Sequence, residues 1–326
     1  MSSHETIVVV RFGAMGDIIH ALPAVTSLKR SFPQKRLIWV VARKWKELLE
    51  GNPYVDELLT FDRDGVSALA ESWKRLRLIK PEIAIDFQGL LQSAIAGRIT
   101  GPKRYLGLDK SIARESFATW FYSECVAATG PHRVERNLQL AAAAGATQLT
   151  KDAWLPPGHP EGELPSGPFV LANTFAGWAS KQWPLSSYEE LARCLSRQGL
   201  ALVANVAPGR VGELAHLSHL KVHASEIPGL IHATRAAIAI VGVDSGPLHL
   251  AGALGKPGVA LFGPTDPAQT GPFNSCMTVL RAAGSETTYK RDERIHASMR
   301  RITPAEVAEA LSRSLTNANT AAVRSL

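Results

Sequence analysis

Residues 238–251 read IAIVGVDSGPLHLA, an apolar run that ends at Asp244 and continues through Ser-Gly-Pro into a helical pattern. Continuous apolar and β-branched residues are typical of a strand that is buried on both faces. Pro247 suits the first turn of a helix, where its missing N–H has no partner to lose. A strand that leads directly into a helix is the repeating unit of doubly wound sheets. This stretch therefore predicts an α/β fold with a parallel sheet.

The same alternation of short apolar runs and helical patterns extends along the whole chain. Further buried strands are predicted at 7–10, 37–41, 83–85, 169–172, 200–204 and 259–262, and amphipathic helices at 188–197 and 230–237. Residues 156–168 hold eight Pro or Gly in thirteen positions, which neither a helix nor a central strand tolerates. We therefore predict one domain over 1–155, a linker over 156–168 and a second domain over 169–315, each with a doubly wound parallel sheet.

The end of the chain carries a helix signal of its own. Thr303 precedes a proline and is followed three residues later by Glu306, which is the pattern of a capping box. A helix is predicted from about Pro304 to Leu315. The tail over 316–326 is small and polar, so it is predicted to be loose.

The composition is typical of a folded protein with two domains. A chain of 326 residues suits two domains at roughly 150 residues each, and 45% hydrophobic with 20% charged residues is typical of a folded protein. The net charge of +7 divides into +5 over residues 1–150 and +2 over the rest. This excess suggests an anionic partner for the first half, but it is too small for a nucleic-acid surface.

Targeting signals and cysteines point to a soluble, cytoplasmic protein. No apolar run approaches the roughly 18 residues of a membrane span, and the N-terminus reaches Arg11 too early for a signal peptide. The three cysteines, Cys125, Cys194 and Cys276, lie far apart in the sequence. They predict no disulfide framework, as in a reducing compartment.

Two loops after predicted strands could carry chemistry, one in each half. The first, Gly13-Ala-Met-Gly-Asp17, lacks the third glycine of the dinucleotide motif, and no P-loop is present. Asp17 has two interpretations, as a helix cap or as a carboxylate that acts as general base. In the second half, a loop of small residues carries Lys181, and Ser187 with Glu190 predicts a capping box for the next helix.

The stretch that opens this section offers a further site. Asp244, Ser245 and Gly246 precede a helix whose free N–H groups suit a diphosphate, and His249 lies in its first turn. The alternative is a helix cap with a histidine at the edge of the core. Another strand, at 259–262, ends in a similar polar turn, so three such loops belong to the second half.

Seven short motifs stand in order along the chain: GDIIHALP at 16–23, DFQGLLQSA at 86–94, ARE at 113–115, HRVER at 132–136, SKQWP at 180–184, DSGPLHLA at 244–251 and FGPTDP at 262–267. Together they resemble the bacterial ADP-heptose:lipopolysaccharide heptosyltransferases of glycosyltransferase family 9. The resemblance covers about residues 6–315 and implies the GT-B fold, with two Rossmann-like domains and a cleft between them. The blocks at 88–90, 113–115 and 265–267 resemble the heptosyltransferase I branch.

The resemblance also implies roles for individual residues. Asp17 matches the base, and Lys181 matches a lysine that contacts the donor phosphates and stabilises the leaving group. Glu213 matches a glutamate that binds the ribose of the nucleotide. Four residues match the donor-binding loop: Asp244, Ser245, Gly246 and His249. Arg63 and Arg114 match arginines that face the acceptor. The chain departs from the family pattern at Ala176 and Gly177, where hydroxyl residues are usual, and over 284–294.

A metal-binding interpretation competes at one place. Asp62-Arg-Asp64 matches the Asp-x-Asp that holds a divalent metal in another glycosyltransferase fold, but Arg63 places a cation between the two carboxylates. Other His, Cys and acidic residues lack metal-ligand spacing. We therefore predict no metal and no cofactor.

The resemblance implies an inverting transferase that moves a heptose from ADP-heptose to the Kdo region of the lipopolysaccharide inner core. Its acceptor would be of the Kdo–lipid A type, and the enzyme would touch the cytoplasmic face of the inner membrane peripherally. A second-heptose transferase or another family 9 member is the near alternative. A nucleotide-sugar epimerase of the same fold and a non-catalytic nucleotide-binding module are more distant ones.

Overall fold

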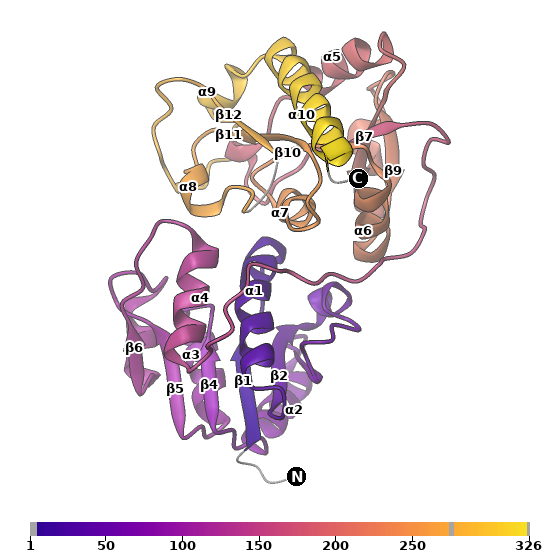
Figure 1. The fold of residues 1–326 in the computed structure, drawn as a ribbon. Helices are drawn as coiled ribbons and strands as arrows, with labels where there is room; N and C mark the ends of the chain where they lie inside the picture. The colour runs from indigo at the N-terminus through magenta and orange to yellow at the C-terminus, as the bar shows by residue number, and fades with distance from the viewer. Residues whose placement is uncertain (1–4, 274–276, 325–326) are drawn as a thin grey trace. The chain divides into compact units, whose positions relative to one another are not determined.

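The computed structural model describes residues 5–273 and 277–324. The chain forms two compact units that divide between Pro156 and Pro157 (Figure 1). Each unit contains a six-stranded sheet in which neighbouring strands pair in parallel. No helix in the described ranges combines the length and apolarity that crossing a bilayer requires.

The first unit has the strand order β3-β2-β1-β4-β5-β6. Its strands are β1 (Thr6–Val10), β2 (Arg36–Ala42), β3 (Glu57–Phe61), β4 (Ile83–Asp86), β5 (Arg104–Leu108) and β6 (Glu124–Val126). Its helices are α1 (Met15–Ser31), α2 (Val66–Arg77), α3 (Leu91–Ile99) and α4 (Arg133–Ala143), with 3-10 helices η2 (Arg43–Leu48) and η3 (Ser116–Phe121). In the register of the central strand, Val8 pairs with Ile38 on one side and Ala84 on the other.

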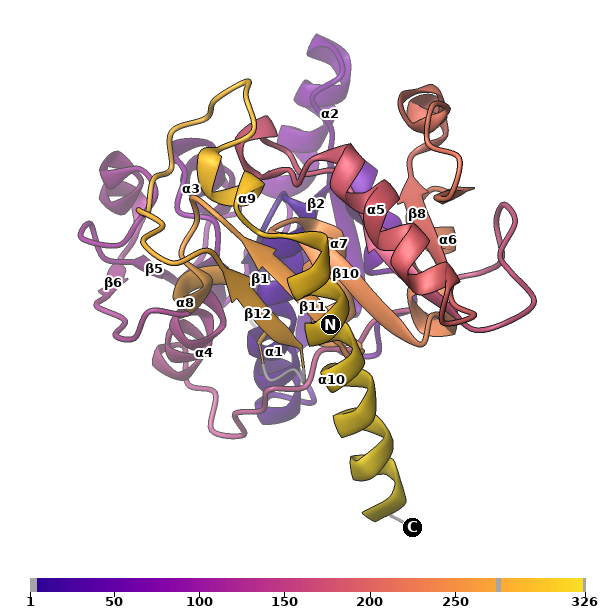
Figure 2. The same ribbon diagram turned by 90° about the horizontal axis from the view of Figure 1, so that it is seen from above.

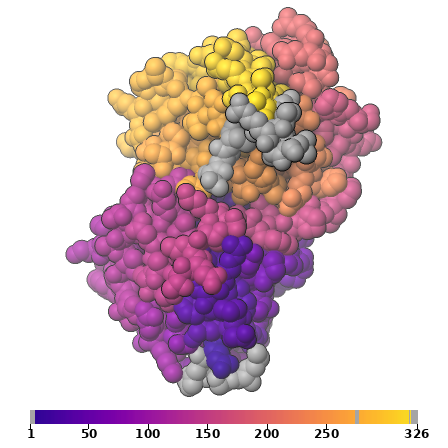
Figure 3. Space-filling view, viewed as in Figure 1, coloured from indigo at the N-terminus to yellow at the C-terminus, as the bar shows by residue number. Residues whose placement is uncertain are grey.

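Helices cover both faces of this sheet. Val8 and Val10 of β1 pack with Leu76 of α2 and Ala94 of α3 in one core. Helices α1 and α4 lie side by side on the opposite face (Figures 1 and 2). In the space-filling view, atoms from the start of the first unit (indigo) lie next to atoms from its later part (magenta) on the visible face (Figure 3). Burial on both faces explains why β1 is an unbroken apolar run.

The second unit repeats this topology, with the order β12-β11-β10-β7-β8-β9. Its strands are β7 (Phe169–Asn173), β8 (Ala201–Val206), β9 (Lys221–Ala224), β10 (Ala239–Val243), β11 (Gly258–Phe262) and β12 (Thr278–Arg281). Its helices are α5 (Leu185–Ser196), α6 (Ile227–Ala236), α7 (Gly246–Ala253), α8 (Pro267–Thr270), α9 (Ala297–Arg300) and α10 (Pro304–Arg324), with 3-10 helices η4 (Ala179–Lys181) and η5 (Pro208–Leu214).

The two faces of the second sheet have separate cores. Leu191 of α5 and Leu311 of α10 pack with Val241 of β10, and α5 and α10 are neighbours. On the other face, Leu248 of α7 packs with Phe262 of β11. In both units the two central strands, β1 with β4 and β7 with β10, mark the point where the strand order reverses, as in a Rossmann sheet. The prediction of doubly wound parallel sheets is confirmed.

Two local predictions were wrong. Helix α10 continues to Arg324 instead of ending near Leu315, because residues 316–324 contain no Pro or Gly that would stop it. Of the tail predicted to be loose over 316–326, residues 316–324 are therefore helical, and 325–326 lie outside the described residues. Ser187 and Glu190 form no capping box, because α5 already begins at Leu185.

Helix α5 begins early because Trp183, the residue before its N-cap, is anchored in the core. The indole of Trp183 is 1% exposed, and its Nε1 donates to the carbonyl of Ile302 at 2.9 Å. This buried anchor fixes the chain just before Pro184, which is the N-cap residue of α5. The Thr303–Glu306 capping box at the start of α10, by contrast, is confirmed by hydrogen bonds in both directions.

The connection between the units is anchored at both ends. Leu155, in the first unit, is 4% exposed. In the second unit, the amide of His159 donates to the carbonyl of Pro228 at 3.4 Å. Gly158 has a φ of +71°, and a Cβ there would lie 2.4 Å from the same carbonyl oxygen, so only glycine fits.

Candidate active site

Asp17 is the centre of the polar cluster in the first unit. It lies in the first turn of α1, beyond the carboxyl end of β1, where parallel sheets bind their ligands. Its side chain is 11% exposed, and Arg11 Nη2 lies 2.5 Å and Arg114 Nη1 3.4 Å from its Oδ2. Arg133 forms an ion pair with Oδ1. One carboxylate thus receives three guanidinium groups.

The three arginines come from different elements and differ in exposure. Arg11 follows β1 directly, has a side chain 5% exposed, and donates through Nη1 to the carbonyl of Phe87 at 2.6 Å. Arg133 is the first residue of α4, and Arg114 lies in the loop after β5. Their side chains are 34% and 45% exposed. Arg11 is therefore a fixed buried cation, whereas the other two are accessible to a ligand.

The arginines decide the charge of Asp17. Burial alone would raise the pKa of Asp17, but Arg11, Arg133 and Arg114 together outweigh burial and hold the pKa well below its usual range. The N-cap position of α1 belongs to Ala14, and no side chain caps this helix. The interpretation of Asp17 as a helix cap is therefore wrong, and its role as a base stays a prediction.

Asp244 is the centre of a second cluster, in the second unit. It follows β10, and its side chain is 5% exposed. Lys181 Nζ lies 2.6 Å from Oδ2, and His249 Nε2 lies 3.3 Å from Oδ1. Burial would raise the pKa of Asp244, but the hydrogen bond from His249 and the charge of Lys181 outweigh it and lower the pKa. The structure thus brings together three residues that the sequence placed in the donor site.

The start of α7 adds polar groups to this edge. Ser245 is the N-cap residue and Gly246 the first residue of the helix, and no side chain caps its amide groups. Several buried side-chain atoms have no hydrogen-bond partner in the described structure: Ser245 Oγ, both amide atoms of Asn173, Thr174 Oγ1 and Thr265 Oγ1. They belong to the carboxyl ends of β10, β7 and β11. Buried polar groups of this kind call for a polar ligand or water.

Comparison of the sequence with known proteins identifies the family of this chain. The family described as glycosyltransferase family 9 (heptosyltransferase) matches residues 69–298. Lipopolysaccharide heptosyltransferase 1 of Pseudomonas aeruginosa is 31% identical over 296 residues, which cover 84% of this chain and 83% of the relative. The chain belongs to glycosyltransferase family 9. Lipopolysaccharide heptosyltransferase 1 of Escherichia coli K12 is another relative, 25% identical over 85% of this chain and 93% of its own length.

Solved structures support the same assignment for the fold of this family 9 enzyme. The Escherichia coli heptosyltransferase WaaC with ADP gives a TM-score of 0.77 at 23% identity, over 95% of this chain and 99% of that one. Escherichia coli ADP-heptose lps heptosyltransferase II gives 0.79 at 23% identity, over 96% and 99%. The predicted GT-B fold and the predicted class of enzyme, a glycosyltransferase, are both confirmed.

Two residues of the family 9 enzyme lie outside these clusters. Glu213 pairs with Arg210 at 2.6 and 2.9 Å, and this hydrogen bonding lowers the pKa of Glu213. Arg63 donates to Gln92 Oε1 of α3 at 2.9 Å. No described contact joins Glu213 to Asp244 or Arg63 to Asp17. The roles of Glu213 and Arg63 stay predictions.

The Asp-x-Asp motif of the family 9 enzyme has protein partners. The carboxylate of Asp62 lies 2.6 Å from Arg43 and accepts the amide of Asp64 at 3.0 Å. Within the described residues, no three His, Cys, Asp or Glu side chains gather closely enough to hold a metal ion. The carboxylate of Asp62 is therefore already paired with the guanidinium group of Arg43.

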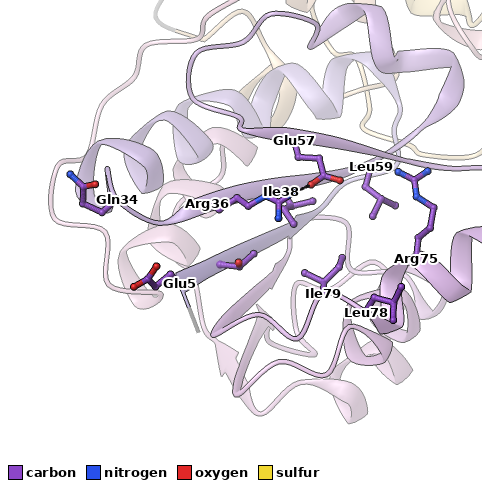
Figure 4. A pocket seen from close by; sticks show the side chains of 10 residues that line it. Glu5, Gln34, Arg36, Ile38, Glu57, Leu59, Arg75, Leu78 and Ile79 are labelled. Atoms are coloured by element: carbon purple, nitrogen blue, oxygen red, sulfur yellow. Dashed lines mark hydrogen bonds and ion pairs between the residues drawn. The ribbon is translucent and has the colours of Figure 1, made fainter. Parts of the chain in front are cut away.

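A cavity of about 390 Å³ lies at the opposite end of the first sheet (Figure 4). It is lined by residues at the amino ends of β1 to β3 and by the end of α2, and the ion pair of Arg36 with Glu57 lies within it. Ligands of parallel α/β sheets bind at the carboxyl ends. This cavity is therefore not the candidate site of the family 9 enzyme.

Sequence reasoning missed Arg11 and Arg133 as site residues. A signal for Arg133 was present, because it opens a helix, where the dipole disfavours a cation. A cation in that position indicates an anionic partner nearby. Asp17 is that partner.

Proposed function

We propose that this enzyme transfers a heptose from ADP-heptose to an acceptor of the lipopolysaccharide inner core, with inversion at the anomeric carbon. The observation that carries the proposal is the convergence of Lys181, Asp244 and His249 beside the start of α7. This convergence occurs in a chain 31% identical to a lipopolysaccharide heptosyltransferase 1. Free amide groups and a lysine suit the diphosphate of a nucleotide sugar.

We further propose addition of the first heptose, to a Kdo–lipid A type acceptor. Supporting relatives include heptosyltransferase 1 proteins of Pseudomonas, Escherichia and Salmonella, while heptosyltransferase 3 of Escherichia coli is 23% identical. A panel of nucleotide sugars and truncated lipopolysaccharides, analysed by mass spectrometry, tests this. We expect one heptose to be added from ADP-heptose to an acceptor that carries none.

The other outcomes of this panel each identify a different function. Addition only to an acceptor that already carries one heptose would assign the second-heptose reaction. Conversion of the sugar nucleotide without acceptor would indicate an epimerase. Tight ADP binding with no turnover would indicate a non-catalytic module.

The second unit would bind the donor and stabilise the leaving group. As the acceptor oxygen forms its bond to the anomeric carbon, the bond from that carbon to the diphosphate breaks and ADP leaves with growing negative charge. Lys181 and the amide groups at Ser245 and Gly246 are placed to stabilise this charge. His249 and Lys181 hold the Asp244 carboxylate ionised and in position.

The first unit would bind the acceptor and remove its proton to Asp17. A carboxylate paired with three arginines is a weak base, because its pKa is held low. The anionic groups of the acceptor would compete for Arg114 and Arg133, the two accessible arginines. Their departure would leave Asp17 paired with Arg11 alone and more basic. Acceptor binding and base activation would then occur together.

Replacement of Arg114 tests the assignment of acceptor binding. Arg114→Ala should raise the acceptor KM by about 10- to 150-fold, the value of one charge-assisted hydrogen bond, and leave the Kd of ADP unchanged. Arg63→Ala should likewise raise the acceptor KM with little change in donor binding. Steady-state kinetics and ADP titration measure both effects. Weaker ADP binding with a normal acceptor KM would reverse the assignment of substrates to units.

Metal removal tests the alternative use of the Asp-x-Asp motif. We expect activity to persist in EDTA, because the proposed diphosphate site is built from cationic side chains and backbone amides, and because Asp62 is paired with Arg43. Transfer assays with and without EDTA measure this. Complete loss that Mg²⁺ or Mn²⁺ restores would assign a metal to Asp62 and Asp64.

An exposed aromatic pair supports peripheral contact with the cytoplasmic face of the membrane. Phe117 and Trp120 of η3 are 58% and 78% exposed, and their rings meet edge to face with centroids 5.0 Å apart. They follow shortly after Arg114 in the chain. Aromatic residues with neighbouring cations favour the interface of an anionic bilayer.

Trp120→Ser should weaken binding to anionic lipid vesicles about tenfold, since it removes one large apolar side chain from the interface. Leu78→Ser is a matched control, because Leu78 is 76% exposed but borders the cavity at the amino ends of the strands. Vesicle sedimentation measures both variants. Equal losses, or none for Trp120→Ser, would place the membrane contact elsewhere.

A further inference from the structure

The positive charge of Lys181 is already matched within the protein. Its Nζ lies 2.6 Å from the carboxylate of Asp244, and the side chains are 18% and 5% exposed. A sugar-nucleotide diphosphate carries a negative charge on each phosphate, so this neutral pair cannot balance it. The preceding loop adds little, because Ala176 and Gly177 have no hydrogen-bonding side chains. Lys181 by itself therefore offers the diphosphate no uncommitted positive charge.

Arg291 supplies such a charge. Lys181 Nζ lies 4.5 Å and Arg291 Cζ 5.2 Å from the centroid of the same indole ring, that of Trp178. The ring of Trp178 attracts a cation through its π-electrons, so one indole positions both groups. Arg291 is exposed, and it pairs with no carboxylate among the described residues. Its charge is thus available to a ligand that reaches Lys181.

Backbone hydrogen bonds fix the segment that contains Arg291 at the carboxyl end of the second sheet. The amide of Thr288 donates to the carbonyl of Pro264, just beyond β11, at 2.8 Å. The amide of His296 donates to the carbonyl of Ser180, next to Lys181, at 3.2 Å. The segment between these two bonds is therefore tied to the carboxyl end of one strand and to the Lys181 turn. Arg291 lies in its middle.

We propose that Arg291 binds the diphosphate of the donor together with Lys181, as a second cation that completes the donor site. This proposal rests on the proposed function, because it takes the second unit to bind a nucleotide diphosphate. It assigns a role to the segment 284–294, which departs from the family pattern. Guanidinium groups suit phosphate oxygens because they donate two parallel hydrogen bonds.

Titration of three nucleotide ligands tests the proposal. Arg291→Gln should weaken ADP binding about tenfold, near the lower limit for a hydrogen bond to a charged group because Arg291 is exposed. The affinity for AMP should fall less, and the affinity for adenosine should not change. Arg291→Lys should recover part of the ADP affinity. Isothermal titration calorimetry measures all three ligands.

Arg294→Gln is the matched control. It removes the same charge from the same segment, but the described contacts of Arg294 do not include Trp178. We expect this variant to bind ADP as the parent enzyme does. Equal weakening by both variants would show a general charge effect and overturn the proposal, as would unchanged ADP binding in Arg291→Gln. Melting temperatures establish that each variant is folded.

The test separates this proposal from the proposed function. If the parent enzyme binds ADP but transfers no heptose, the proposed function fails while the comparison of Arg291 with Arg294 still stands. If transfer occurs and Arg291→Gln binds ADP normally, only the role of Arg291 fails.

Discussion

Asp17→Asn should lower kcat by about 10²- to 10⁴-fold, the usual contribution of a general base, and leave the Kd of ADP unchanged. The amide keeps the shape of the carboxylate but cannot accept the proton of the acceptor hydroxyl. Donor binding should survive, because Asp17 belongs to the first unit and the donor cluster to the second. Transfer kinetics and ADP titration measure the two effects. Normal turnover would remove Asp17 from the chemical step.

Stability must be checked in this variant, because the amide leaves three guanidinium groups facing a neutral side chain. Loss of one partner from a buried ion pair costs about 3–5 kcal/mol. Folding lowers the pKa of Asp17, so its ion pairs stabilise the unit above about pH 4 and lose this effect as the pH falls toward the folded-state value. Melting curves near neutral pH therefore show the full cost. Asp109→Asn, at a half-buried carboxylate after β5 that pairs with no arginine in the described residues, is the matched control.

Lys181→Ala should both weaken ADP binding and slow the chemical step. Loss of a charge-assisted hydrogen bond lowers the affinity about 10- to 150-fold. Loss of a group that stabilises the leaving diphosphate lowers kcat by a further factor of about 10² to 10³. A fall in both parameters distinguishes a transition-state contact from simple ground-state binding. ADP titration and single-turnover kinetics measure the two effects separately.

Two control variants are needed to interpret the effect of Lys181→Ala. Lys181→Arg keeps the charge near Asp244 and should retain more activity than the alanine variant. Lys221→Ala removes an exposed lysine from β9 of the same unit and should change neither parameter. Weaker ADP binding with a normal kcat would limit Lys181 to ground-state binding of the donor.

The central strands could be predicted from sequence because burial on both faces makes them unbroken apolar runs. Strands β1, β7, β10 and β11 are of this kind, and each is fully buried. The strands that were missed are β3, β5, β6, β9 and β12, of which four are edge strands. Edge strands have one unpaired side and carry polar residues, as in Lys221–Ala224. Their patterns cannot be told from loops by periodicity alone.

The candidate site could be predicted where its residues follow a strand in the chain. Asp17, Lys181 and Asp244 were found in this way, and the family motifs then implied their roles. Arg133 is 116 positions from Asp17, so no local pattern shows that they form an ion pair. Arg291 lies in a turn-rich segment without periodicity, and only the fold places it against Trp178.

The anchored connection between the units bears on the rate at which two bound substrates can meet. Between Leu155 and Gly158 the chain has only Pro156 and Pro157, whose rings fix φ near −65°. Two fixed φ angles reduce the number of conformations that this joint can adopt. For substrates held on separate units, this restriction sets an effective concentration in place of a bulk one. In this enzyme, Pro156 and Pro157 would thus tune how often substrates on the two units meet.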